Sequence, residues 1–469
     1  MPVGDIVPEI AVIVTAVVAL LTASFVPHRL HSLAAVIALA GIAFAAVLLS
    51  RQIGTSTLTF SGTWVIDGAS VWSRLMILLS TAVVVLMAPR WFQSDRRHGE
   101  FYFVLLVAML GAMALAGAAD LLQLVIAVLL SSVTGYTLAA YHRNWPLSLE
   151  AGMKYFLVGA LANAVLVLGV ALVYGMVGTT SYDGMREALA TNAHAPLLLL
   201  GTGLTIVGLL FKLGAVPAHA WLPDVAEGAP APAAAFLTVV PKIGAAIAIA
   251  RFVDLFPPDA FAVRPLIAVA AFATMTLGNL AALGQSDVRR LLGWSSVSQS
   301  GYVLMAVAVV GLTNLALPAI LLFMLGYAAA NLAAFAAVTH LRGRTDLSDY
   351  AGLARSRPWI AVALAVALLS LVGIPPLAGF VGKLALFLAT IEAGYAWLAV
   401  AAAMNTVASL YYYLKIVGRT ALHAKPAGGT AVLSVTSGVA LWSSLAAVLA
   451  FGLLAELTVR AFAGGTLLP

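Results

Sequence analysis

Cysteine is absent from the 469-residue sequence. Without a thiol, the chain cannot hold a thiolate-bound iron–sulfur cluster, attach a c-type haem or form a disulfide. The eight histidines include no pair or trio at a spacing typical of metal ligands. Any redox chemistry connected with this protein must therefore belong to another chain.

Charged residues are also scarce, at 9% of the chain, whereas soluble domains carry roughly 25%. Hydrophobic residues reach 63% and the mean hydropathy is +1.06. A chain of this composition cannot cover a water-facing surface, which indicates a membrane protein. The net charge of +6 does not indicate nucleic-acid binding, because no basic stripe is interleaved with aromatic residues.

Long apolar runs predict an all-α polytopic membrane protein of about fourteen transmembrane helices, since roughly 20 apolar residues cross a bilayer. The predicted spans are residues 7–26, 32–50, 70–89, 101–117, 120–141, 152–176, 197–222, 229–252, 264–284, 290–311, 314–340, 358–388, 393–418 and 431–460. The N-terminus carries Asp5 and Glu9 and has no basic segment. The first apolar run is therefore expected to be a retained span and not a cleaved signal peptide.

The distribution of lysine and arginine predicts the orientation, because cytoplasmic loops carry an excess of both. Loops after odd-numbered spans contain fourteen: Arg29, Arg90, Arg96, Arg97, Arg143, Arg289, Arg290, Arg342, Arg344, Arg355, Arg357, Lys415, Arg419 and Lys425. The opposite side has five: Arg51, Arg186, Arg251, Arg264 and Arg460. With an even number of spans, this bias predicts a bacterial inner (plasma) membrane protein with both termini on the non-cytoplasmic side.

Two predicted spans contain proline near their middle, Pro217 in the seventh span and Pro375–Pro376 in the twelfth. Proline removes a backbone donor and disfavours helix at the preceding residue, so both helices are expected to break inside the membrane. Broken helices at corresponding places in two halves are typical of inverted repeats around an ion path. We therefore predict N-terminal helices 1–3 in 1–100, a repeat of helices 4–8 in 101–252, a second repeat of helices 9–13 in 264–418, and a C-terminal helix in 431–460.

Apart from Lys415, which is at the end of the thirteenth span and is counted with the loops, four lysines fall inside predicted spans: Lys154, Lys212, Lys242 and Lys383. A charged lysine at the centre of a membrane helix costs roughly 2.5–3.5 kcal/mol on insertion scales. Four buried lysines without a function would therefore make insertion of the helices much less favourable. A buried lysine can gain and lose a proton, whereas arginine stays charged. The four side chains are therefore candidates for a proton relay.

A simpler interpretation stands beside this one, because a lysine near the end of a span can extend its amine to the interface. Lys154, three residues into its span, fits that interpretation best. Arg74, near the start of the third span, is expected to be an interface anchor. His219, beyond Pro217, is either a further relay group or a hydrogen-bonded structural histidine. All eighteen acids fall in loops or near span ends, so none lies at the centre of a span.

Several motifs occur in a fixed order between about residues 100 and 420. They are SLEAGMKYF at 148–156, FK at 211–212, PAHAWLPDV at 217–225, EGAP at 227–230, PK at 241–242, GNL at 278–280, RRLL at 289–292, SSVSQSGY at 295–302, GIPPLAGFVGK at 373–383 and YYYLK at 411–415. In these motifs the chain resembles the antiporter-like membrane subunits of respiratory complex I, most closely the subunit N branch. That family shares a superfamily with Mrp-type antiporter subunits, which lack the run at 411–415.

The resemblance implies a proton channel within a complex that passes electrons from NADH to a quinone. By the family's pattern, Lys154 and Lys212 form the relay of the first half, Lys242 the central connection and Lys383 the terminal site. The resemblance also implies no cofactor or metal on this chain. NADH, FMN, iron–sulfur clusters and quinone are expected on partner subunits, and the partners are other membrane subunits within the bilayer.

One position departs from the family's pattern. The family has a glutamate in the middle of span five that pairs with the lysine at the position of Lys212, and here that position is Leu129. The run 128–132 contains no carboxylate, and the nearest acids, Asp120 and Glu150, lie near span ends. This departure leaves three hypotheses. Proton pumping through this subunit is lost, another acidic residue replaces the glutamate, or the channel uses a modified relay.

The sequence thus favours a proton-translocating subunit of a NADH–quinone oxidoreductase, or a close variant fed by another donor. Two alternatives stay open. One is a subunit of an Mrp-type sodium/proton antiporter. Transport that depends on sodium and is unaffected by NADH would favour this alternative. The other is a structural subunit that kept the fold and lost proton pumping. Unaltered coupling of proton transport to electron transfer after Lys212→Ala would favour this alternative.

Overall fold

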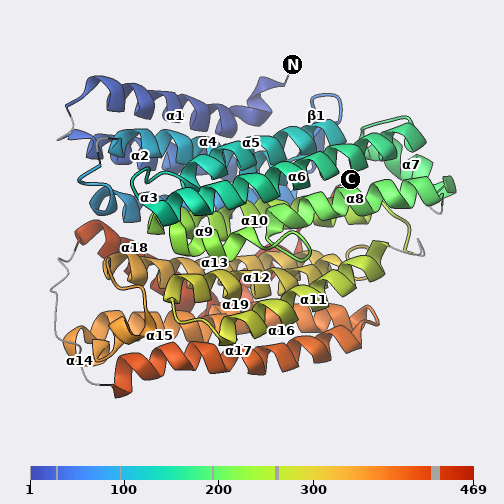
Figure 1. The fold of residues 1–469 in the computed structure, drawn as a ribbon. Helices are drawn as coiled ribbons and strands as arrows, with labels where there is room; N and C mark the ends of the chain where they lie inside the picture. The colour runs from blue at the N-terminus through green and yellow to red at the C-terminus, as the bar shows by residue number, and fades with distance from the viewer. Residues whose placement is uncertain are drawn as a thin grey trace.

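The computed structural model describes residues 2–27, 30–95, 97–192, 195–258, 263–423 and 434–468. Arg29, Arg96, Lys425 and residues 431–433, which the sequence predictions used, lie outside this set. The described chain is a bundle of long, roughly parallel helices (Figure 1). Its order up to residue 254 is η1 (Val3–Ile6), α1 (Val7–Phe25), α2 (Ser32–Ser50), β1 (Thr57–Thr59), β2 (Trp64–Ile66), α3 (Gly68–Trp91), α4 (His98–Ala116), α5 (Leu121–Ala139), α6 (Pro146–Val177), α7 (Tyr182–Asn192), α8 (Pro196–Leu213), α9 (Trp221–Gly228) and α10 (Ala231–Asp254).

The remaining elements are also helical. They are α11 (Val263–Leu283), α12 (Val288–Val307), α13 (Ala316–His340), η3 (Leu347–Tyr350), α14 (Leu353–Ser356), α15 (Pro358–Val372), α16 (Ala378–Glu392), α17 (Ala396–Leu422), α18 (Val435–Leu453) and α19 (Ala455–Ala463). Eleven helices in the described residues are long and apolar enough to cross a membrane. The prediction of an all-helical polytopic membrane protein is confirmed, while the count of fourteen spans stays a prediction. The other three predicted spans correspond to α12, to the pair α15 and α16, and to α17.

Both predicted helix breaks are confirmed. Helix α8 ends at Leu213 and α9 begins at Trp221, while α15 ends at Val372 and α16 begins at Ala378. The residue after each first segment is a glycine in the left-handed conformation, Gly214 with φ 71° and Gly373 with φ 95°. A side chain at positive φ is strained, so glycine ends each helix and leaves its last carbonyls without helical partners.

Three features differ from the expected pattern of spans. The antiparallel hairpin of β1 and β2 pairs Thr57 with Ile66, and α7 is a short amphipathic helix. Both are too short and too polar to register as apolar runs. The predicted last span is two helices, α18 and α19, separated at Leu454.

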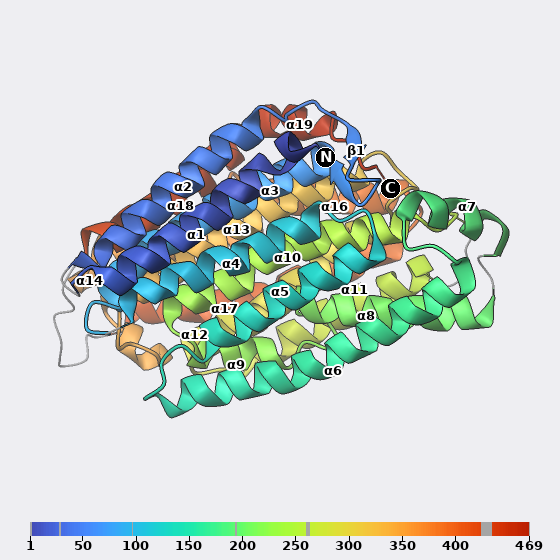
Figure 2. The same ribbon diagram turned by 90° about the horizontal axis from the view of Figure 1, so that it is seen from above.

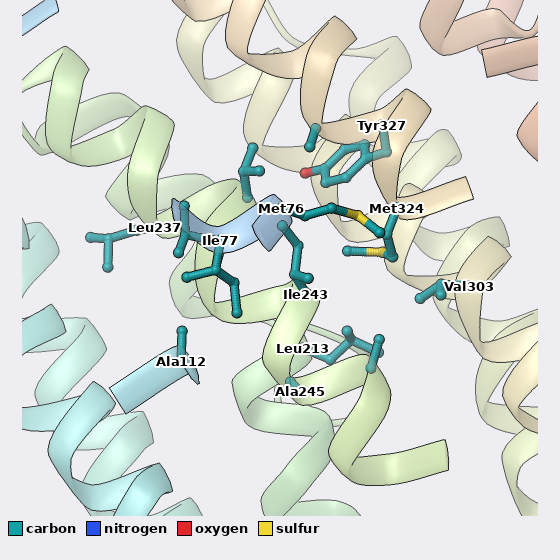
Figure 3. Close-up of a cluster of buried hydrophobic side chains, with 14 of the residues drawn as sticks. Met76, Ile77, Ala112, Leu213, Leu237, Ile243, Ala245, Val303, Met324 and Tyr327 are labelled. Carbon is teal, nitrogen blue, oxygen red and sulfur yellow. The ribbon is translucent and has the colours of Figure 1, made fainter. Parts of the chain in front are cut away.

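The centre of the bundle is formed by α10 and α13, which Figure 2 shows between α1 and α2 on one border and α6 on the other. The apolar window of α10 is entirely buried and that of α13 is 94% buried. Ile243 of α10 packs in the central cluster with Ile77 of α3 and Met324 of α13 (Figure 3). Small residues permit this closeness, since a Cβ on Gly244 would lie 2.3 Å from the Ala112 carbonyl oxygen. A closely packed centre therefore surrounds Lys242, the residue before Ile243.

Candidate functional site

Lys212 lies in the last turn of α8, directly before the break, and is only 1% exposed. Its amine donates to the Ser132 hydroxyl of α5 at 3.3 Å. No ion pair to Lys212 occurs within the described ranges. Its charge is thus compensated by hydroxyl and backbone dipoles and not by a carboxylate.

Ser132 connects Lys212 to a second hydroxyl. It hydrogen-bonds to Tyr136, one turn further along α5, and the Tyr136 hydroxyl accepts from the Asn163 amide of α6 at 3.3 Å. A Cβ on Gly159 would lie 2.1 Å from that hydroxyl, so the absence of a side chain there makes room for Tyr136. The polar chain from Lys212 therefore runs toward the end of α6 at which Lys154 lies.

Leu129 is one turn from Ser132 on α5 and is 38% exposed. Its side chain thus lies partly on the outer face of the helix, while Ser132 is fully buried. Residues three apart are neighbours on a helix surface. A longer polar side chain at position 129 would therefore lie close to the Ser132 hydroxyl.

Lys242 lies in the middle of α10 and is 1% exposed. Its amine donates to the Ser296 carbonyl at 2.6 Å and to the Ser300 hydroxyl at 2.7 Å, both on α12. The Ser300 hydroxyl in turn donates to the Leu213 carbonyl at 2.7 Å. Lys242 is therefore linked through one serine to the exposed carbonyl end of the broken helix α8.

Lys383, on α16, is 4% exposed. Its amine donates to the Val372 carbonyl at 2.8 Å, the last residue of α15, and lies 3.5 Å from the Thr406 hydroxyl of α17. It also lies 4.2 Å from the centre of the Tyr302 ring. A cation over an aromatic face is attracted by the ring quadrupole, so this site too holds an ammonium without a carboxylate.

The two breaks therefore have the same arrangement. A Cβ on Gly214 would lie 3.7 Å from Cε of Lys242, and one on Gly373 would lie 3.0 Å from Cδ and 3.8 Å from Cε of Lys383. In both, a left-handed glycine ends the helix, its final carbonyls stay unpaired within the helix, and a buried lysine packs over the glycine. Lys383 donates to the final carbonyl of α15 directly, whereas Lys242 is linked to that of α8 through Ser300.

Helix α12 spans the distance between the two arrangements. Its polar run SSVSQS supplies Ser296 and Ser300 to Lys242, and the amide of Gln299 donates to the Leu371 carbonyl at 3.1 Å. Leu371 precedes Val372, whose carbonyl binds Lys383. One polar helix face thus links the lysine of α10 to the carbonyl end of α15.

Lys154 differs from the other three lysines. Its side chain is 45% exposed and pairs with Glu150 at 2.7 Å and Asp224 at 3.2 Å. Lys154 is thus not buried like the other three, which agrees with the simpler interpretation kept open for it, in which its amine extends to the interface. The reason is that α6 begins at Pro146, well before the predicted start, and Lys154 lies on its outer side; its role in a relay stays a prediction. Arg290 of α12 binds Asp224 at 2.5 Å and Glu227 at 2.7 Å, so an ionic network joins α6, α9 and α12.

His219 and Arg74 also have defined positions. His219 lies between α8 and α9 against the Trp294 ring, and it hydrogen-bonds to the Pro217 backbone. The hydrogen bonds of the described residues connect it to none of the four lysines, so its relay role stays a prediction. The interface-anchor prediction for Arg74 is wrong, since this side chain is fully buried and pairs with Glu9 at 2.9 Å.

The polar and aromatic groups that contact or connect the buried lysines were not predicted: Ser132, Tyr136, Ser296, Ser300, Gln299, Tyr302 and Thr406. The sequence carried one signal for them, the run of serines and glutamine at 295–300 inside an otherwise apolar span. No cluster of three His, Asp or Glu residues that could hold a metal occurs in the portion of the chain that the structure describes.

These features define a polytopic membrane protein with two broken helices and buried lysines at their ends, and sequence comparison identifies the class. The profile of the NADH:quinone oxidoreductase/Mrp antiporter transmembrane family matches residues 118–409. The chain belongs to this family.

Within it, the chain is similar to subunit N of NADH–quinone oxidoreductases. It is 44% identical to subunit N 1 of Streptomyces griseus over 417 residues, covering 87% of each chain. It is 43% identical to subunit N of a Mycobacterium species over 399 residues, covering 85% of this chain and 84% of the relative.

Solved structures agree with this assignment. A chain of respiratory complex I from Thermus thermophilus with bound aureothin aligns with a TM-score of 0.84 at 32% identity, covering 98% of this chain and all of that one. A chain of the Mrp complex from Dietzia has the same fold, with a TM-score of 0.82 at 23% identity over 99% of this chain and 97% of that one.

Proposed function

We propose that this chain is the proton-translocating subunit N of a bacterial NADH–quinone oxidoreductase. The observation that carries the proposal is the repeated arrangement at the two breaks, where a buried lysine packs over the terminal glycine and is linked to the carbonyl end of a helix, directly for Lys383 and through Ser300 for Lys242. An ammonium held by carbonyl and hydroxyl oxygens can release a proton to a neighbour without leaving a buried carboxylate unpaired. Such a group suits a stepwise relay.

The proposed route begins at the half-exposed Lys154 and its carboxylate partners. It continues through the hydroxyls of Tyr136 and Ser132 to Lys212, through the Ser300 hydroxyl, which the Leu213 carbonyl holds in place, to Lys242, and along the polar face of α12 to Lys383. Each hydroxyl accepts one proton and passes on its own, so one proton leaves the far end for each that enters. Protonating one lysine disfavours the charge on the next, which couples successive steps.

This route favours a modified relay over a substitute acid at the position of Leu129. Glu150 and Asp224 are both occupied with Lys154, while the Ser132 hydroxyl is the group that contacts Lys212. We expect Leu129→Glu to give Lys212 an anionic neighbour and to shift the pH profile of proton uptake. Leu129→Gln, of similar size but neutral, is the control. An unchanged profile in both variants would mean that position 129 takes no part.

The proposal includes fourteen transmembrane helices, two inverted repeats of five, and both termini on the non-cytoplasmic side. The excess of arginine and lysine in one set of loops supports that orientation. NADH, FMN, iron–sulfur clusters and quinone would belong to partner subunits. This chain would meet other membrane subunits of the assembly within the bilayer.

The test uses the whole complex reconstituted in vesicles, with protons taken up per NADH oxidised as the readout. Lys212→Ala and Lys383→Ala are expected to lower this ratio, while Arg355→Ala, which removes an exposed charge, leaves it unchanged. An unaltered ratio in both lysine variants would favour the structural alternative. Sodium-dependent proton exchange that continues without NADH would favour the antiporter alternative.

A further inference from the structure

Two adjoining cavities lie where α3, α13, α15 and α18 meet at one end of the bundle. The first has a volume of about 400 Å³ and is lined by Arg90 and Arg342. The second has a volume of about 500 Å³ and is lined by Trp359 and Trp442. His340 lines both, so the two cavities adjoin there and together form one amphipathic site.

The first cavity is cationic. Among the residues that the structure describes, no aspartate or glutamate lines either cavity. Burial and the neighbouring charge of Arg90 lower the pKa of Arg342, which means that the two guanidinium groups repel one another without a carboxylate between them. An anion placed between them would relieve that repulsion.

The cationic groups are also held in position. The Arg342 guanidinium donates to the Trp91 carbonyl at 2.8 Å and lies 4.7 Å from the centre of the Trp91 ring. A guanidinium fixed in this way keeps other N–H groups available for a phosphate oxygen. The His340 ring is hydrogen-bonded to the Ser437 hydroxyl at 3.1 Å, so it too is ordered at the junction of the two cavities.

The second cavity is apolar and opens to the side of the bundle. Trp359 of α15 is 71% exposed and Trp442 of α18 is 46% exposed, on helices whose outer faces are apolar. Tryptophan is enriched where a membrane protein meets the headgroup level of the bilayer. A ligand in the whole site would thus have a compact anionic end and an apolar chain.

We propose that this site binds an anionic phospholipid, with its phosphodiester between Arg90 and Arg342 and an acyl chain along Trp359 and Trp442. A zwitterionic lipid would bring its own ammonium group beside the two arginines and bind more weakly. The proposal is independent of proton transport, since neither arginine belongs to the lysine route.

The experiment measures lipid retention by the purified complex. The complex is delipidated in detergent, titrated with phosphatidylglycerol or phosphatidylcholine, and analysed by native mass spectrometry. Because each basic residue near anionic lipid contributes about five-fold in affinity, Arg90→Gln/Arg342→Gln should weaken phosphatidylglycerol binding about 25-fold. Arg355→Gln/Arg419→Gln, which removes two exposed charges that line neither cavity, should leave it unchanged.

A variant in the apolar cavity, where the acyl chain would lie, tests the two parts of the site separately. Trp442→Gln should weaken the binding of both lipids to a similar extent, whereas the double arginine variant should weaken the binding of phosphatidylglycerol more than that of phosphatidylcholine. Equal retention of both lipids by the unmodified complex would overturn the proposal, and so would binding of inorganic phosphate alone. Since the chain has no cysteine, Ser437→Cys also offers a single cross-linking point on it. A cross-link from this position to a neighbouring subunit would assign the site to that subunit instead.

Discussion

At the scale of single residues, the sequence predicted which charges matter better than it predicted their surroundings. Lys212, Lys242 and Lys383 are buried as expected, because a lysine within an apolar run has few alternatives. Their partners are 80, 54 and 11 residues away in sequence, and such contacts depend on packing between helices. Lys154 was predicted at depth because hydropathy does not show that α6 starts earlier than its apolar run.

The residue-scale prediction concerns two adjacent serines on α5. Ser132→Ala removes the contact with Lys212 and should slow proton translocation about ten-fold, since a hydrogen bond to a charged group contributes about 1.5 kcal/mol or more. Ser131→Ala is the matched control, because the Ser131 hydroxyl is equally buried and has no partner in the described residues. Proton uptake by reconstituted complex checks both. Rescue by Ser132→Thr and an altered pH profile in Tyr136→Phe would separate a relay from packing, whereas equal effects of the two alanine variants would contradict the relay.

At the scale of elements, apolar length and proline position were enough to predict most helices and both breaks. The hairpin of β1 and β2 and the helix α7 were missed, because neither contains a long apolar run. The equivalence of the two breaks was only partly predictable. Proline indicated where each helix ends, but the packing of Lys242 and Lys383 over Gly214 and Gly373 requires helices that come together from different parts of the chain.

The element-scale prediction tests whether the glycine at a helix break is needed for the packing of the lysine or only for the backbone turn. Gly373→Ala places a Cβ at positive φ and 3.0 Å from Lys383 Cδ. Gly394→Ala, with φ 82° and nothing within 4 Å, imposes similar backbone strain of roughly 1–2 kcal/mol without touching a lysine. We expect both to lower the melting temperature slightly and only Gly373→Ala to lower the proton yield. Equal proton yields in the two variants would mean that the break is purely structural.

At the scale of the whole molecule, a buried ion pair ties distant parts of the chain together. Arg251, at the end of α10, donates to Asp67 at 2.8 Å, and both side chains are fully buried. The backbone N–H of Leu468 donates to the same carboxylate at 2.8 Å, and Arg251 also donates to the Leu468 carbonyl. The start of α3, the central helix and the C-terminal segment thus meet at one carboxyl group, at the end of α10 beyond Lys242.

The pair makes the stability of the molecule depend on pH. Burial alone would raise the pKa of Asp67, but the charge of Arg251 and hydrogen bonds from Arg251, Ser70 and Leu468 outweigh it and lower the pKa below its ordinary 3.8. A carboxyl with a lowered folded-state pKa stabilises the fold fully above its unfolded pKa, and this contribution is lost as the pH falls through the folded value. The loss of folding stability at low pH should therefore depend on the contact between Asp67 and Arg251.

We expect Asp67→Asn to cost about 3–5 kcal/mol, because it leaves Arg251 buried without its counter-charge. Thermal unfolding of the purified complex at pH 7 measures the loss, which should shrink as the pH falls below the ordinary value of 3.8 toward the lowered folded-state pKa of Asp67, where the unmodified carboxyl becomes protonated in the folded protein too. Glu456→Gln is the control, since it breaks the ion pair with Arg460 on the exposed surface. A melting temperature at pH 7 that Asp67→Asn leaves unchanged would mean that the C-terminal segment does not hold α3 and α10 together through this carboxylate.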